Sequence, residues 1–248
     1  MSGDYVKQYA SAPARNRAEA NYRWLIRLQD PAHLPERRYS GERELRFQHI
    51  EGRHALPADL AMLAAHLGHV HGSVHAAELR KAQLPRPYSA AGGQLLPAFP
   101  AGRLAAVERE LAAGHVPGAR LTVSQARRLI ASADGPPAFY KDANPRNFLI
   151  TRDGTPVTID FDDLTLAPFG YDLAKLTVTL AMTHGRIPAT AITEALSAYN
   201  SAANSHCPIL IPVAWDELMG WAEIHHILTA RYANGVRYPY LWNQTRPL

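Results

Sequence analysis

The chain has 248 residues, of which 47% are apolar and 19% are charged, a composition that allows one large or two small domains with a sizeable core. It excludes a disordered or collagen-like chain. The 26 lysines and arginines exceed the 22 acids and give a formal net charge of +4, but they form no run of five or more. The charge is therefore poor evidence for a nucleic-acid partner.

A single cysteine, Cys207, excludes an intramolecular disulfide framework, and the lack of an obvious base nearby favours an inert side chain over a catalytic one. No stretch approaches the ~20 apolar residues of a membrane span, and no basic segment followed by an apolar one opens the chain. We therefore expect a cytoplasmic protein with no membrane partner.

In chain order, the first fifty residues predict a strand at 5–9, a helix at 15–28 and a second strand at 45–50. A long helix is expected from 57 to about 81, because leucines and valines recur there at spacings of three or four. Residues 85–102 are rich in proline and glycine and indicate a loop.

Helical patterns resume at 104–113 and 124–132, with Ser124 as the expected N-cap of the second. Short apolar runs at 148–151 and 157–161 flank an Asp-Gly pair, which predicts an antiparallel hairpin. Three more helices are expected after it, at 173–183, 189–203 and 215–233. The chain thus reads as a small mixed N-terminal piece followed by a mostly helical piece with one embedded hairpin.

Polar residues converge on one end of the predicted hairpin. Asp142 lies in the loop before it, Asn147 at its start, and Asp160 where the second strand ends. Carboxylate and amide oxygens brought together in this way suit Mg²⁺, which usually completes its shell with waters and substrate phosphates. The remaining carboxylate is then placed to accept a proton from a hydroxyl nucleophile.

A family resemblance rests on the combined pattern Asp142-x-x-x-x-Asn147, hairpin, Ile159-Asp160 and Asp172-Leu-Ala. This pattern resembles the aminoglycoside phosphotransferase family, which has a protein-kinase-like fold. The resemblance implies Asp142 as catalytic base, Asn147 and Asp160 as magnesium ligands, and Asp172 as a buried residue that braces the catalytic loop.

The resemblance also implies a fold class and its division. We expect an α+β, protein-kinase-like fold of two lobes. A reduced N-terminal sheet lobe and hinge would occupy residues 1–52, and a mainly helical C-terminal lobe with the catalytic loop and hairpin would occupy 53–248.

One departure from the family lies directly before the catalytic acid. The family usually has His-Gly there, whereas this chain has Tyr140-Lys141. Two interpretations stay open: Lys141 contacts the γ-phosphate or the substrate, and Tyr140 fills the structural place of the histidine. The base and the metal ligands are retained, but the change puts the chain outside the mainstream antibiotic-resistance members.

The segment that the resemblance assigns to nucleotide binding also departs from the family pattern. Lys7 and Glu19 resemble the strand lysine that contacts ATP phosphates and the helix glutamate that pairs with it. Residues 45–52 resemble the hinge that holds adenine, with Gln48 and Ile50 as expected contacts. The family has a glycine-containing strand pair ahead of that lysine, and only six residues precede Lys7. We expect either a truncated start or a short lobe that a protein partner completes.

Other polar residues are further candidates for metal, capping or substrate contacts. Asp162 is a candidate for a further metal contact and Asp163 for a capping acid. The fold implied by the resemblance uses C-terminal helices to wall the acceptor site, which makes candidates of Glu223, His226 and Arg231. No zinc-protease motif accompanies the four histidines of the long helix, so a partly exposed helix face is expected rather than a zinc site: His66, His69, His71 and His75.

We therefore expect an ATP- and Mg²⁺-dependent phosphotransferase that moves the γ-phosphate to a hydroxyl of a small molecule, such as an amino sugar or antibiotic. A Ser or Thr of a peptide in natural-product biosynthesis is the second acceptor class. The alternative is a pseudokinase-like binding or scaffold subunit. The missing nucleotide cover favours this alternative, and the retained Asp142, Asn147 and Asp160 disfavour it.

Overall fold

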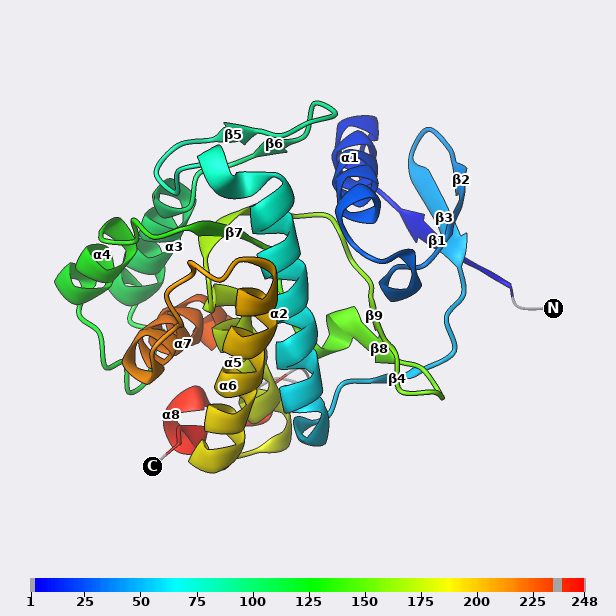
Figure 1. Cartoon of the computed structure of the whole chain (residues 1–248). Coiled ribbons are helices and arrows are strands. Elements are labelled where there is room, and N and C mark those ends of the chain that lie inside the picture. Colours follow the sequence, from blue (N-terminus) through cyan, green and yellow to red (C-terminus); the bar gives the residue numbers. More distant parts are fainter. Residues whose placement is uncertain (1–2, 234–237, 248) are drawn as a thin grey trace.

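The computed structural model describes residues 3–233 and 238–247. They form a small N-terminal lobe of sheet and one long helix beside a larger, mainly helical C-terminal lobe (Figure 1). The α+β, two-lobe class predicted from the sequence is confirmed. The position of the lobe boundary at residue 52 stays a prediction.

The N-terminal lobe is an antiparallel sheet in the order β1-β3-β2, against which helix α1 packs. Strand β1 spans Asp4–Gln8, β2 Arg37–Ser40 and β3 Glu44–Gln48, and α1 spans Ala12–Leu28. Two of these strands and the helix agree with the prediction. Strand β2 was missed because its sequence, Arg-Arg-Tyr-Ser, has no apolar alternation.

Four long helices form the centre of the C-terminal lobe: α2 (Leu60–Ala77), α5 (Tyr171–His184), α6 (Ala189–His206) and α7 (Trp215–Thr229). Helices α2 and α6 lie very close together at two glycines of α2. A Cβ on Gly68 would lie 2.2 Å from the carbonyl oxygen of Tyr199, and one on Gly72 would lie 2.5 Å from that of Ala203. Only glycine therefore fits at these two positions.

The remaining α-helices of the described residues are α3 (Pro100–Ala112), α4 (Val123–Ala131) and the short α8 (Trp242–Thr245). The N-cap of α4 is Thr122, whose hydroxyl accepts the N–H of Gln125, so the expected cap at Ser124 is wrong by two residues. The expected loop at 85–102 contains two short paired strands, β5 (Tyr88–Ser89) and β6 (Leu95–Leu96).

The predicted hairpin is present as antiparallel strands β8 (Phe148–Ile150) and β9 (Pro156–Thr158). Gly154, with a φ of 87°, lies in the connection between them. Three short strands were missed because none is long enough for alternation to show: β4 (Arg53–His54), β7 (Pro137–Tyr140) and β10 (Thr165–Pro168). Strand β4 pairs with β8, and β7 pairs with β10 next to the loop that contains Asp142.

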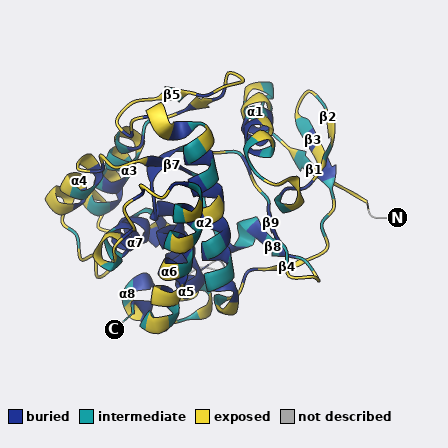
Figure 2. Cartoon of the chain, viewed as in Figure 1, coloured by how far each residue is buried: buried dark blue, intermediate teal, exposed yellow. Residues whose placement is uncertain are grey.

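Burial is deepest in α5, in which Tyr171 to Met182 are all buried (Figure 2). Three histidines of α2 are also buried, which corrects the expected partly exposed face: His66, His71 and His75. The Nδ1 atom of His71 lies 2.8 Å from the hydroxyl of Tyr199, because α6 covers this side of α2. Within the described residues no helix is long and apolar enough to cross a membrane.

Candidate active site

The loop after β7 holds Asp142 in a left-handed backbone conformation, with a φ of 58°. Asp160, at the end of the hairpin, has a φ of 73°, and these two are the non-glycine residues with positive φ in the described part of the chain. Such conformations are uncommon for non-glycine residues and cluster at functional sites. The backbone thus singles out two acids that the sequence analysis selected on other grounds.

Asp172, in the first turn of α5, binds the backbone of the loop that contains Asp142. Its fully buried carboxylate accepts the backbone N–H groups of Lys141 and Ala143, both at 3.0 Å. On the other side, Asn147 donates its side-chain N–H to the backbone carbonyl of Asp142 at 2.8 Å. The loop is therefore held on both sides of Asp142.

One oxygen of the Asp142 carboxylate faces two donors. The hydroxyl of Tyr140 donates to Oδ1 at 2.8 Å, and the ammonium of Lys175 lies 3.3 Å from the same oxygen. Burial raises the pKa of Tyr140 well above its usual value, so its hydroxyl stays a donor. Lys175 was not predicted from the sequence, although its position three residues after Asp172 on one helix face could have indicated it.

Lys141 points into the protein instead of toward the open side of the site. Its ammonium donates to the Thr158 hydroxyl at 3.0 Å and lies 4.0 Å from the centroid of the Phe148 ring. Burial lowers the pKa of Lys141 to about 7. Because only 7% of the residue is exposed, the structure does not support the expected contact with phosphate or substrate.

A cavity of about 610 Å³ lies between the N-terminal sheet and the hairpin. It is lined by four residues that the sequence analysis assigned to the nucleotide and the metal: Lys7, Gln48, Ile50 and Asp160. Apolar side chains line it as well, among them Phe47, Leu149, Ile159 and Phe161. The cavity therefore combines an apolar surface with a charged end at Lys7 and Asp160.

At the charged end, one cation lies between two carboxylates. The ammonium of Lys7 is 2.6 Å from Oδ1 of Asp160 and 2.9 Å from Oδ1 of Asp162. Burial alone would lower the pKa of Lys7, but the two acids outweigh it and raise the pKa. The two carboxylates thus place negative charge at this end of the cavity, and carboxylate oxygens are among the ligands that Mg²⁺ takes in proteins.

The predicted pairing of Lys7 with Glu19 is not formed. Glu19 is buried in α1, and its carboxylate accepts hydrogen bonds from three guanidinium groups and one hydroxyl: Arg15, Arg23, Arg37 and Ser40. Two of these arginines are one helical turn away on either side, so the local helix geometry brings them to the acid. Burial opposes ionisation of Glu19, but Ser40 and the arginines lower its pKa.

Residues 5–205 match the model of the phosphotransferase enzyme family. The chain belongs to this family. No curated protein matches the chain. The aminoglycoside-3'-phosphotransferase of type VIII is 19% identical, with a TM-score of 0.52 over 90% of this chain and 84% of that one. These findings confirm the predicted family.

Two other solved structures show the same kinase-like fold. A choline/ethanolamine kinase family protein from Mesorhizobium loti is 15% identical, with a TM-score of 0.57 over 93% of this chain and 74% of that one. Amicoumacin kinase hAmiN, solved with AMP-PNP and Ca²⁺, is 14% identical, with a TM-score of 0.55 over 98% of this chain and 78% of that one. None of these comparisons supports the expected protein partner.

In this member of the phosphotransferase family, the three C-terminal candidates for substrate contacts have other partners. Glu223 is buried and forms an ion pair with Arg246 at 2.5 Å, and His226 is fully buried beside them. Arg231 lies 3.5 Å from the carboxylate of Glu110. Glu223 and His226 therefore anchor the end of the chain, so the structure does not support them as a wall of the acceptor site.

Proposed function

We propose that this phosphotransferase-family protein transfers the γ-phosphate of ATP to a hydroxyl group of a small molecule, with Mg²⁺ as cofactor. One observation carries the proposal: the cavity of about 610 Å³ ends at the Lys7 ammonium, which lies between the carboxylates of Asp160 and Asp162. Asn147 connects this end to the catalytic loop, because its carbonyl accepts the N–H of Ile159 and its side chain donates to the Asp142 carbonyl.

Asp160 and Asn147 are the residues that would hold Mg²⁺. The side-chain nitrogen of Asn147 is already bonded to the loop, which leaves its amide oxygen to act as the ligand. A bound Mg²⁺ neutralises charge on phosphate oxygens. Lys7 then contacts the phosphates instead of the two carboxylates.

Asp142 would act as the base. Tyr140 and Lys175 hold its Oδ1, so Oδ2 is the oxygen that accepts the proton of the acceptor hydroxyl. The strained backbone and the bonds to Asp172 fix where this oxygen points. Positioning and charge stabilisation of this kind supply most of the rate in phosphoryl transfer.

The acceptor class follows from the neighbours' names. They are phosphotransferases or kinases of aminoglycosides, a macrolide, amicoumacin and choline, all of them small molecules. We therefore prefer a small-molecule hydroxyl to a peptide Ser or Thr.

Calorimetric titration with AMP-PNP tests the nucleotide and metal site. We expect binding to require Mg²⁺ and to weaken by roughly tenfold or more in Asp160→Asn, because a charged ligand of the metal is lost. Asp163→Asn, at an exposed neighbour, is the matched control and keeps the wild-type affinity. Equal affinity in both variants would remove the metal role of Asp160.

A second test separates transfer from binding. Asp142→Asn should bind AMP-PNP as the wild type does and lose on the order of 10² to 10⁴ in transfer rate, since an amide cannot take the proton. ADP release with a panel of hydroxyl-bearing acceptors measures this rate. Wild-type turnover in Asp142→Asn would contradict the assignment, and nucleotide binding without turnover in the wild type would favour the pseudokinase alternative.

A further inference from the structure

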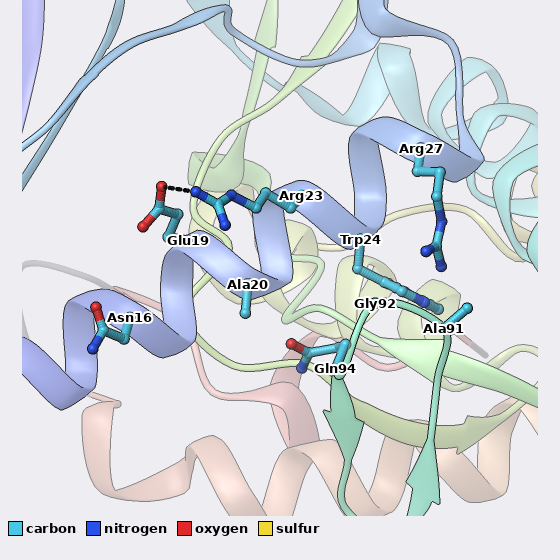
Figure 3. Close-up of a pocket in the computed structure, with 9 residues that line it drawn as sticks. All are labelled: Asn16, Glu19, Ala20, Arg23, Trp24, Arg27, Ala91, Gly92 and Gln94. Carbon is cyan, nitrogen blue, oxygen red and sulfur yellow. Dashed lines mark hydrogen bonds and ion pairs between the residues drawn. The ribbon is translucent and has the colours of Figure 1, made fainter.

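Two buried ring nitrogens, Nε1 of Trp24 and Nε2 of His71, have no hydrogen-bond partner among the described residues. Trp24 lies at a cavity between α1 and the connection from β5 to β6, where the Glu19 carboxylate already accepts a hydrogen bond from Arg23 (Figure 3). His71 is 1% exposed, and its Nε2 lies 3.6 Å from Oδ2 of the fully buried Asp172. The nitrogen of His71 therefore faces a buried charge.

The position of the protons on His71 follows from the hydroxyl of Tyr199. This hydroxyl accepts the backbone N–H of Gly170 at 3.0 Å and lies 2.8 Å from Nδ1 of His71. Burial raises the pKa of Tyr199, so the hydroxyl keeps its proton. Among the described residues, Nδ1 of His71 is the acceptor for that proton and so carries none of its own. The imidazole is therefore neutral, with its hydrogen on Nε2.

The Nε2 hydrogen of His71 meets a carboxylate that can accept it. Asp172 has about four acceptor sites, and the N–H groups of Lys141 and Ala143 occupy two of them at 3.0 Å each. A fully buried carboxylate is costly unless donors surround it. At 3.6 Å the imidazole N–H lies slightly beyond hydrogen-bond distance, but its dipole still stabilises the charge in surroundings of low polarity.

Packing fixes the imidazole in this orientation. The ring of His71 meets the rings of Phe139 and Phe169 edge to face, with centroids 5.1 and 6.2 Å away. The close approach of α2 and α6 at Gly68, three residues before His71, brings Tyr199 to the other nitrogen. The imidazole therefore connects α6 to the first turn of α5.

We propose that His71 is a positioning residue for phosphoryl transfer, whose Nε2–H keeps the carboxylate of Asp172 bonded to the loop that contains Asp142. The Tyr199 hydroxyl holds the imidazole in the tautomer that this requires. The two N–H groups that Asp172 accepts belong to the residues on either side of Asp142. A carboxylate that turns would release them and displace the oxygen that takes the proton. The proposal rests on the proposed role of Asp142 as base.

The tautomer is tested without an activity assay. We would label the protein with ¹⁵N-histidine, record the two-bond correlations of the imidazole nitrogens, and assign His71 by the signal that His71→Gln removes or, if that variant does not fold, by contacts with the Tyr199 ring. We expect the neutral Nε2–H form. His75 is the internal reference: its Nδ1 lies 2.9 Å from the carbonyl of Pro137, which only accepts, so a proton on Nδ1 is expected there. Tyr199→Phe should leave His71 as a mixture of both tautomers.

Two replacements of His71 separate a donor from a side chain that only fills space. Glutamine and methionine are of similar length, but only glutamine carries an N–H that can reach Asp172. His71→Met should lower ATP turnover with the panel of acceptors by roughly tenfold and keep the AMP-PNP affinity, whereas His71→Gln should recover most of the rate. His69→Asn, at an exposed histidine of the same helix, is the control and keeps the wild-type rate.

Amide hydrogen exchange reports on the loop itself. In His71→Met the N–H groups of Lys141 and Ala143 should exchange roughly tenfold faster than in the wild type, because their acceptor is held less firmly. The N–H of Ile159, bonded to the carbonyl of Asn147 at 2.9 Å, is the control for overall stability and should be unchanged.

Three results would overturn the proposal: a proton on Nδ1 of His71 in the wild type, equal turnover in His71→Met and the wild type, or an equal acceleration of exchange at Ile159 and in the loop. A wild type without turnover would instead contradict the proposed phosphotransferase activity. The tautomer and the exchange rates would then still decide whether His71 holds Asp172 in place, so the two failures are distinguishable.

Discussion

Two buried lysines near Asp142 have opposite surroundings. Lys141 contacts a hydroxyl and an aromatic ring, whereas Lys175 faces the carboxylate of Asp142. The first ammonium is therefore poorly compensated, and the second is paired. This difference leads to two predictions, one on stability and one on turnover.

Lys141→Met should remove a pH-dependent destabilisation of the folded state. The pKa of Lys141 is lowered from 10.5 to about 7. Between these pH values the unfolded chain binds more protons than the folded chain. The free energy of unfolding of the wild type therefore rises by up to about 1.4 kcal/mol for each unit of pH increase. The variant should be more stable than the wild type at pH 7, and the difference should shrink toward pH 9.5.

Urea unfolding from pH 7 to 9.5 measures this difference, with Lys81→Met, at an exposed lysine, as the control that keeps the wild-type pH profile. A constant difference between Lys141→Met and the wild type across that range would contradict the prediction.

Lys175→Met should lower ATP turnover by roughly tenfold or more without changing AMP-PNP affinity. The ammonium holds Oδ1 of Asp142 from 3.3 Å, and its loss lets the carboxylate turn. Lys175→Arg, which keeps the charge, should recover part of the rate. Steady-state ADP release together with calorimetry separates the two effects, and a loss of nucleotide affinity equal to the loss of turnover would point to damage to the fold instead.

At the scale of elements, the contact between α2 and α6 depends on two glycines. Gly68→Ala should destabilise the protein by about 3 kcal/mol or more, because the new methyl group would meet a backbone carbonyl at 2.2 Å, which cannot move without the helix. Gly102→Ala, in α3 with nothing within 4 Å, should instead stabilise it by about 0.5–1 kcal/mol. Thermal unfolding of both variants checks the sign of each change.

At the scale of the molecule, the segment at Asp160–Asp162 connects the lobes. Lys7 of β1 pairs with both acids, and Asn21 of α1 donates to the carbonyls of Phe161 and Asp162 at 2.6 and 3.0 Å. The side chain of Asn21 also accepts from Gln94, next to β6 in the C-terminal lobe. A ligand bound beside this segment should therefore stabilise both lobes together.

Mg²⁺ with AMP-PNP at about 100 times its dissociation constant should raise stability by about 2.7 kcal/mol, or roughly 5–10 °C in Tm. The melt should stay a single transition, because the lobes share the segment that the nucleotide contacts. Differential scanning calorimetry with and without EDTA checks the metal requirement. Two separate transitions, with only one shifted, would contradict the shared role of this segment.

Local chemistry alone was enough to predict most helices, the hairpin and the acids at its end. Asp142, Asn147 and Asp160 lie within one short loop and one hairpin, so their convergence follows from turn residues and strand pairing over 18 positions of sequence. Lys7, Gln48 and Ile50 were found through their resemblance to a known family. The structure brings them to one cavity with Asp160.

Only the tertiary structure decided the direction and the partners of the other polar side chains. Whether Lys141 or Lys175 faces Asp142 depends on how β7 and α5 pack, and whether Glu19 meets Lys7 or Arg37 of β2 depends on how α1 lies on its sheet. The same holds for His71 of α2, which meets Tyr199 of α6 from more than a hundred residues away in sequence. Periodicity specifies which face a residue occupies, but the partner of that face is set by long-range packing, which no local pattern contains.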